Sequence, residues 1–300
     1  MKKLARCLAL CTLIAAGAQA SQMKVVILGT GTPNPDPERS GPALAVIKDN
    51  QSYLIDAGPG VVRRAESARQ KHNIPALAAS QLQTAFLTHL HTDHTVGLPD
   101  LLFTSWTLER PVPLAVYGPE GTKKMMTHLQ KAYQQDIHIR LNGLEPANEQ
   151  GYKVDVTEFE GAKPLLKKGD FKVTAIPVLH GSWQHSFGYK FEDGKRSIVI
   201  SGDARPSPEL IKAAKGVDVL VHEVYSTEGF KTRPPVWQKY HSSFHTSTKE
   251  LAEIAKKTQP KLLVLYHQLY WGTTDADLIK EIRKYGYKGK VVSAADLDMY

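Results

Sequence analysis

Short apolar runs rich in β-branched residues recur along the chain, and clusters of Gly, Pro, Asn and Asp separate them. This alternation predicts β-strands, because branched and aromatic side chains suit a buried pleated surface and the intervening residue types favour turns. Residues 141–168 show the least regular pattern, so we expect loops and short strands there. The predicted strands span residues 24–28, 43–47, 53–56, 85–88, 114–117, 171–178, 197–201, 217–221 and 262–266.

The segments between the predicted strands carry helical patterns with recognisable ends. One helix begins at Ser207, where Pro and Glu follow in the first turn, and ends at Gly216. A capping box that starts at Ser247 begins a helix over residues 251–257, and a last helix covers residues 275–285. Strands and helices interleave without a long linker or a visible internal repeat, which is typical of a single α/β domain.

The first twenty residues differ from the rest of the chain. Three basic residues precede an apolar run over residues 7–17, which ends in the small-residue sequence Ala-Gln-Ala. This order predicts a secretory signal peptide over residues 1–20, cleaved after Ala20, and a mature domain at residues 21–300. A membrane anchor is the alternative, but the run is too short to span a bilayer and no stop-transfer pattern follows. We expect a periplasmic or secreted protein without stable membrane insertion.

Both cysteines, Cys7 and Cys11, lie inside the predicted signal peptide, so the mature chain would contain none. It would then have no disulfide and no thiolate metal ligand. Any bound metal must therefore use His, Asp and Glu, which are donors suited to zinc or manganese.

The charge balance changes little when the signal peptide is removed. The whole chain has 38 Lys and Arg against 30 Asp and Glu, and the loss of three basic residues leaves 35 against 30, a net charge of +5. This mild excess favours anionic substrates, but the basic residues form no cluster that would predict a nucleic-acid groove.

His and Asp side chains follow four of the predicted strands at the point where each strand ends. Because ligands of α/β sheets converge at the carboxyl ends of the strands, we expect these side chains to meet at one edge. A single His after a strand is more often structural, and we interpret His72, His128 and His138 in that way. A dense cluster with three strand-end partners instead favours a metal centre. Its members are His89, His91, Asp93 and His94 after one strand, and His180, Asp203 and His267 after three later ones.

Seven potential ligands exceed what one catalytic ion needs. A catalytic zinc ion takes about three protein ligands and keeps one position for water, so the set fits two ions. Two ions roughly 3.5 to 4 Å apart can share a bridging hydroxide near neutral pH. Asp203 is the carboxylate expected to bridge them. Zinc is expected, and manganese or iron are alternatives that ligand identity does not separate.

The pattern His-x-His-x-Asp-His at residues 89–94 is the hallmark of the metallo-β-lactamase superfamily, and the chain resembles that family through nearly all of the mature domain. The resemblance implies a four-layer αβ/βα sandwich with the metals at one edge. It also implies how the ligands divide between the two ions. His89, His91 and His180 would bind the first metal, Asp93, His94 and His267 the second, and Asp203 would bridge both.

Several shorter motifs narrow the resemblance to the branch that contains ribonuclease Z and the metallo-β-lactamase-type arylsulfatases. Each glycine-rich motif alone has low specificity, whereas the set together favours this branch strongly. The motifs are ILGTGT at residues 27–32, DAGPG at 56–60, GLPD at 97–100, VYGP at 116–119, SGDAR at 201–205, HE at 222–223 and HTS at 245–247.

Three residues are candidates for catalysis. By resemblance to ribonuclease Z, His245 would stabilise the developing charge or protonate the leaving group. Glu223 would orient His245 from behind, and Asp93 is included as both metal ligand and catalytic residue. For His245 and Glu223, a structural role is the alternative.

The chain departs from ribonuclease Z in ways that disfavour transfer RNA as its substrate. That enzyme carries an RNA-gripping arm between the third motif histidine and the bridging aspartate, whereas His180 and Asp203 are only 23 positions apart. The last motif is LYHQLYW at residues 265–271 instead of the Ser/Arg-containing version of that enzyme. The predicted export signal also argues against a transfer RNA substrate.

The leading hypothesis is an exported dinuclear metal-dependent hydrolase of small anionic esters, with arylsulfatase-like cleavage of a sulfate ester as the first choice. Phosphodiester hydrolysis is the close alternative, since both substrates have tetrahedral oxyanion centres that two metals can bind. A lactonase is a third possibility. A non-catalytic binding protein is disfavoured because all seven ligand positions are filled, and a homo-oligomer is left open.

Six side chains near the motifs are candidates to line a pocket for an aromatic leaving group. Packing in the core is the alternative for each of them. They are Trp183, His185, Trp237, Tyr240, Tyr266 and Trp271.

Overall fold

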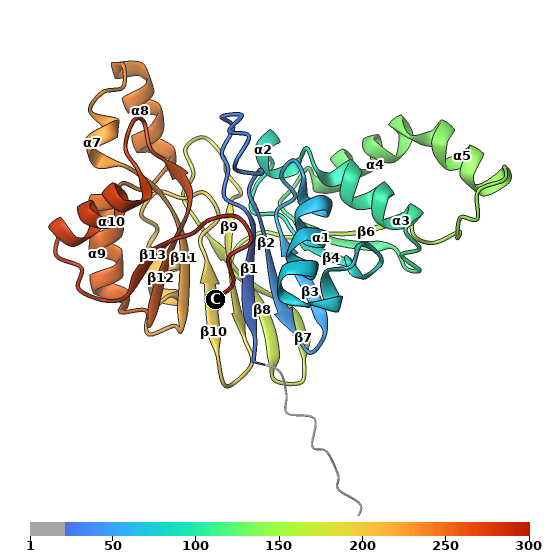
Figure 1. Cartoon of the computed structure of the whole chain (residues 1–300), viewed down its shortest axis with the longest axis horizontal. Coiled ribbons are helices and arrows are strands. Elements are labelled where there is room, and N and C mark those ends of the chain that lie inside the picture. Colours follow the sequence, from blue (N-terminus) through green and yellow to red (C-terminus); the bar gives the residue numbers. More distant parts are fainter. Residues whose placement is uncertain (1–21) are drawn as a thin grey trace, which may run out of the picture.

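The computed structural model describes residues 22–300, so the predicted signal peptide lies outside the described residues. Two β-sheets occupy the centre of the molecule, and helices cover their outer faces (Figure 1). No helix within residues 22–300 combines the length and the apolar character that a bilayer crossing requires.

The first sheet has six strands that lie side by side in sequence order. They are β1 (Lys24–Gly29), β2 (Ala43–Lys48), β3 (Gln51–Ile55), β4 (Thr84–Phe86), β5 (Leu114–Gly118) and β6 (Val154–Glu158). β1, β2 and β3 pair antiparallel, and the sheet continues from β3 to β6 with parallel neighbours.

The second sheet has seven strands and, like the first, consists of an antiparallel part and a parallel part. They are β7 (Lys163–Lys168), β8 (Phe171–Pro177), β9 (Phe187–Glu192), β10 (Ser197–Ile200), β11 (Val219–Tyr225), β12 (Leu262–Leu269) and β13 (Val291–Ser293). Neighbours from β7 to β10 are antiparallel, and those from β10 to β13 are parallel.

Helices flank both sheets. They are α1 (Val61–His72), α2 (Thr92–Thr95), α3 (Ser105–Thr107), α4 (Thr122–Ala132), α5 (Gln134–Asn142), α6 (Pro208–Ala213), α7 (Thr227–Phe230), α8 (Pro235–Phe244), α9 (Thr248–Thr258) and α10 (Asp275–Lys284), with the short 3₁₀ helices η1 (Pro75–Leu77) and η2 (Ala79–Gln81) and the π-helix η3 (Asp100–Thr104). α1 packs on the first sheet, and α6, α9 and α10 pack on the second. Figure 1 also shows α4 and α5 extending sideways from the body.

The hydrophobic core consists of three layers of apolar side chains, because successive residues of a strand point to opposite faces. In β1, Val25 and Ile27 pack between the two sheets, whereas Val26 and Leu28 pack toward α1. In β11, Val221 faces the other sheet and Val224 faces the helices. The expected four-layer sandwich of helices, sheet, sheet and helices is therefore confirmed.

All nine predicted strands are present, and the capping box that starts at Ser247 begins α9 as expected. β6 and β7 occupy the segment expected to hold loops and short strands. Sequence analysis missed β9, in which Phe187, Tyr189 and Phe191 point into the core. It also missed β13, which is only three residues long.

Candidate metal centre

The seven predicted ligands gather at one edge of the sandwich, beside α2 in Figure 1. Six of them are buried, and only His91 is partly exposed. They are His89 and His91 after β4, Asp93 and His94 on α2, His180 after β8, Asp203 after β10 and His267 within β12.

Three histidines form the first group. Nε2 of His89 lies 2.9 Å from Nδ1 of His91, and Nε2 of His180 lies 3.2 Å from the same nitrogen. The other ring nitrogen of His180 donates to the carbonyl oxygen of Phe244 at 2.9 Å, and Nδ1 of His89 contacts Oγ1 of Thr88. These outer contacts hold the rings so that three nitrogen atoms converge, as the ligands of one ion do.

The second group combines Asp93, His94 and His267. Oδ2 of Asp93 lies 3.4 Å from Nε2 of each histidine. Oδ2 of Asp203 lies 3.4 Å from Nε2 of His94 and 3.6 Å from Nε2 of His267, while Asp203 also belongs to the first group. Asp203 is thus the only one of the seven that lies within ligand distance of both groups, which is where a bridging carboxylate would stand.

The ionisation of His89 and Asp203 suits a bound cation. Burial lowers the pKa of His89 well below its usual value, so its imidazole is neutral. Burial alone would raise the pKa of Asp203, but His267 and His94 hold it well below its usual range. Nε2 of His94 and Oδ1 of Asp203 are also buried without a hydrogen-bond partner, which is costly unless a ligand binds them. The residues therefore fit two divalent ions.

Asp56 is a supporting residue that sequence analysis included only as part of a family motif. It is fully buried, and its carboxylate accepts from the Thr88 amide at 2.8 Å and the Thr88 hydroxyl at 2.9 Å. Its Oδ2 also lies 2.8 Å from Nδ1 of His94. Asp56 therefore fixes the tautomer of His94 and leaves Nε2 facing the centre.

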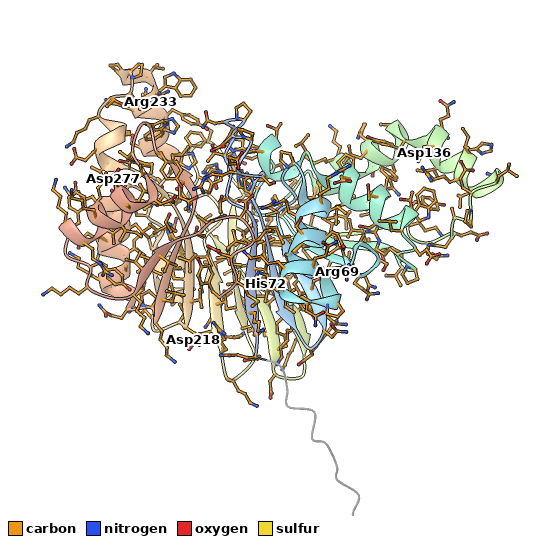
Figure 2. All side chains as sticks on the ribbon, viewed as in Figure 1. Arg69, His72, Asp136, Asp218, Arg233 and Asp277 are labelled. Carbon is orange, nitrogen blue, oxygen red and sulfur yellow. The ribbon has the colours of Figure 1, made fainter. Side chains whose placement is uncertain are left out.

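Replacing Asp56 with alanine is expected to lower zinc affinity by roughly 10- to 100-fold, the usual effect of losing a carboxylate behind a metal-binding histidine. Competition with a chromophoric chelator measures this change. Asp218→Ala is a matched control at the opposite edge of the sheets (Figure 2). Equal affinities of the Asp56 variant and the wild type would contradict an orienting role.

A β-bulge directs His267 into the centre. Sequence analysis expected the strand to end at Tyr266, but β12 continues to Leu269. The pairing with β11 shifts at this point, so that Glu223 pairs with Tyr266 and the next pair skips His267. The φ of His267 is +46°, in the left-handed region that β-branched residues avoid. The bulge changes the direction of one side chain while the strand remains in the sheet.

Gly202 sets the position of Asp203. Its φ is +61°, and a Cβ atom there would lie 2.8 Å from the carbonyl oxygen of Phe187 and from Cβ of Thr88. Glycine is the residue that tolerates both conditions, so the chain can leave β10 sharply and bring Asp203 to the ligands.

His245 and Glu223 lie together beside the predicted ligands. Nδ1 of His245 is 3.2 Å from Oε1 of Glu223, and the same oxygen accepts from the amides of Ala204 and Thr246. Burial lowers the pKa of His245 to about 4. Burial, followed by the charge of Asp203, raises the pKa of Glu223 well above its usual value. Glu223 thus fixes the ring of His245 and the backbone next to Asp203 at once.

A cavity of about 360 Å³ opens onto the centre. One part of its lining comes from the predicted metal ligands and His245, and another from α8 and the segment after β12. The first part is His91, Asp93, Asp203, His245 and His267, and the second includes Trp237, Tyr240, His241 and Trp271.

The six pocket candidates from the sequence divide into two groups. Trp237, Tyr240 and Trp271 line the cavity. Tyr266 instead packs in the core between the sheets, and the indole N–H of Trp183 donates to Nε2 of His91 at 2.8 Å. The last candidate, His185, lies beside the carboxylates of Glu120 and Glu160 and does not line the cavity.

The sequence patterns did not single out Pro33, Asn34, Arg233 or His241 as cavity residues. His241 is at helical spacing from Trp237, which is a signal that could have found it. Arg233 stands between α7 and α8 in a segment without a motif, and only the tertiary structure brings it to the cavity.

Residues 51–268 match the family described as Beta-lactamase superfamily domain. With the clustered His and Asp donors, this match identifies the class, and the chain belongs to the metallo-β-lactamase superfamily of metal-dependent hydrolases. Within that class it lies in the ribonuclease Z-like branch. It is 32% identical to ribonuclease Z from Mycobacterium bovis over 248 residues, which cover 82% of this chain and 85% of that protein. Ribonuclease Z from Mycobacterium avium gives the same identity and the same coverage.

Solved structures share the fold. The metallo-beta-lactamase fold protein YhfI from Bacillus subtilis superposes with a TM-score of 0.71 at 19% identity, covering 93% of this chain and 98% of that one. The short form of human tRNase Z superposes with a TM-score of 0.68 at 24% identity, covering 93% of this chain and 98% of that one. The resemblance inferred from the motifs is confirmed for the superfamily and for the ribonuclease Z-like branch.

Proposed function

We propose that the protein is a dinuclear phosphodiesterase, which reverses the order of the two ester hypotheses from sequence analysis. The observation that carries this proposal is a complete set of two converging ligand groups in a chain whose relatives include ribonuclease Z, a nuclease. Nucleases cleave phosphodiesters, so the alternative hypothesis has better support than sulfate ester hydrolysis.

The substrate is proposed to be a small diester, and transfer RNA is disfavoured. The segment between His180 and Asp203 holds only a short loop and the strands β9 and β10. It contains no inserted arm of the kind expected for gripping RNA. We further propose that the protein is exported, because of the sequence pattern of residues 1–20.

The side chains of the protein would hold the two metal ions, and His245 would transfer a proton during the reaction. Two divalent ions bound by the seven ligands would polarise the ester and activate a water molecule as the nucleophile. Asp93 and Asp203 line the cavity, and their carboxylates would neutralise part of the positive charge of the two ions. An anionic ester would neutralise a further part when it binds. His245 contacts Glu223 through Nδ1, so Nε2 is the ring nitrogen that remains available. Because the ring is neutral, Nε2 would first take the proton that the attacking water loses and then pass it to the leaving oxygen.

Sulfate ester hydrolysis keeps one observation in its favour. Trp237, Tyr240 and Trp271 line the cavity, as expected for an enzyme with an aromatic leaving group. The same rings also suit an aryl or nucleoside group of a phosphodiester, so they do not favour sulfate over phosphate.

A rate comparison tests the proposal. The zinc-loaded chain from Ser21 onward is expected to hydrolyse bis-p-nitrophenyl phosphate with a kcat/KM at least roughly tenfold above that for p-nitrophenyl sulfate, because the proposed substrate is a phosphodiester. The release of p-nitrophenolate reports both reactions. Faster sulfate cleavage would restore the arylsulfatase hypothesis, and activity on a lactone alone would assign the protein to the lactonases.

A further inference from the structure

α7 and α8 rise beside the metal edge (Figure 1). Residues of α8, with Arg233 just before it, line one side of the cavity. Trp237, Tyr240 and His241 are spaced by three and four residues on α8, so they share one side of that helix. Trp271 follows β12 and packs against His241, with ring centres 4.5 Å apart. We call Arg233, Trp237, Tyr240, His241 and Trp271 the flap wall.

Arg233 is a cation without an acidic partner in this wall. Its guanidinium lies 5.7 Å from the centre of the Trp271 ring. Within residues 22–300 it forms no ion pair, and its Nε is buried without a hydrogen-bond partner. Figure 2 shows Arg233 at the end of the molecule where α7 and α8 project. Because Arg233 lines the cavity, its guanidinium is available to a polar or anionic group of a bound molecule.

His241 carries a second unpaired atom in the same wall. Its Nδ1 is buried without a partner, and burial lowers the pKa of its ring to about 4, so the ring is neutral near pH 7. The flap wall therefore brings two polar side chains, those of Arg233 and His241, to the cavity. A bare hydrocarbon ring would form no hydrogen bond with either of them.

Trp237 offers a flat apolar surface next to these polar groups. Its side chain is 47% exposed although it lines the cavity. It stacks on His241 at 5.8 Å and meets Tyr240 edge-on at 5.8 Å, which holds the indole in place. Asn34 also lines the cavity, and its amide adds a further hydrogen-bonding group.

We propose that the flap wall is a nucleoside subsite, and that the substrates are phosphodiesters of mononucleotide or dinucleotide size. This inference rests on the proposed phosphodiesterase function. A nucleobase has a flat face for Trp237 and a polar edge for Arg233 and His241, whereas a simple aryl group has only the face. The cavity volume of about 360 Å³ is near the lower end for small-molecule sites and suits a ligand of this size.

Two substrates with the same leaving group isolate the nucleoside. They are the p-nitrophenyl ester of thymidine 5′-monophosphate and methyl p-nitrophenyl phosphate. The zinc-loaded wild type is expected to prefer the thymidine ester by at least roughly tenfold in kcat/KM, since stacking and edge contacts act on only one of them. Trp237→Ala and Arg233→Gln should each lower this ratio by roughly tenfold and change the methyl ester rate little.

Lys239→Gln is the matched control, because Lys239 is an exposed cation on the same helix and does not line the cavity. It should leave the substrate ratio unchanged. Equal kcat/KM values for the two esters in the wild type would overturn the subsite. So would variants that slow both esters equally.

Calorimetry separates this inference from the proposed function. Zinc-loaded protein is titrated with thymidine 5′-monophosphate and, separately, with methyl phosphate. The wild type should bind the nucleotide at least roughly tenfold more tightly, and both wall variants should lose that difference. Tight nucleotide binding without hydrolysis of either ester would contradict the phosphodiesterase and retain the subsite. Hydrolysis of both esters, together with equal affinities for thymidine 5′-monophosphate and methyl phosphate, would support the phosphodiesterase and contradict the subsite.

Discussion

Replacing Asp203 with alanine is expected to remove metal from both groups and to lower kcat/KM for phosphodiesters by at least roughly 10³-fold. The expected loss is large because Asp203 alone lies beside both groups, 3.4 Å from Nε2 of His94 and within the cluster of His89, His91 and His180. Its removal also leaves buried imidazoles without their counter-charge. Elemental analysis of the purified protein and initial rates measure the two effects.

Two further variants sharpen this experiment. Asp203→Asn keeps the shape of the side chain and removes its charge, so it should lose metal nearly as completely as the alanine variant. Asp218→Asn removes a carboxylate that pairs with Lys261 at the opposite edge, and it should retain both metals and full activity. An Asp203→Ala protein with two bound ions and near-normal rates would exclude the bridging role.

The positions of the seven predicted ligands follow from features that a single sequence contains. His180 and Asp203 lie three residues after β8 and β10. Both strands are antiparallel to β9, so they run in the same direction and their carboxyl ends lie at one edge. Such local signals are strong because they depend only on chain order and strand direction. The same holds for α9, whose capping box depends on residues three positions apart.

Other parts of the site depend on contacts between distant segments. Asp56 reaches His94 across 38 positions, and the role of its carboxylate is visible only when the first sheet is assembled. Arg233 enters the cavity because α7 and α8 fold beside Trp271. The bulge at His267 is likewise a property of its pairing with β11, and the sequence pattern alone predicted a strand that ends at Tyr266. Local patterns cannot specify such contacts.

Replacing His245 with alanine is expected to slow the cleavage of a thymidine dinucleotide by roughly 10²- to 10⁴-fold, the usual contribution of a positioned proton donor. Cleavage of bis-p-nitrophenyl phosphate should fall by only roughly tenfold, because p-nitrophenolate leaves without needing a proton. This contrast distinguishes proton donation from a structural role, which would slow both substrates alike. Initial rates at saturating substrate report it, with metal content checked for each variant.

The Glu223→Gln variant is expected to cleave the thymidine dinucleotide at a rate between those of the wild type and of His245→Ala. Its amide oxygen can still accept from the backbone of Ala204 and Thr246, so the segment after β10 keeps its anchor. The contact with Nδ1 of His245 changes from a carboxyl group to an amide, and the ring loses part of its orientation. His72→Ala, outside the cluster, should leave both rates unchanged. If Glu223→Gln slows the two substrates equally, Glu223 supports the fold and not the proton transfer.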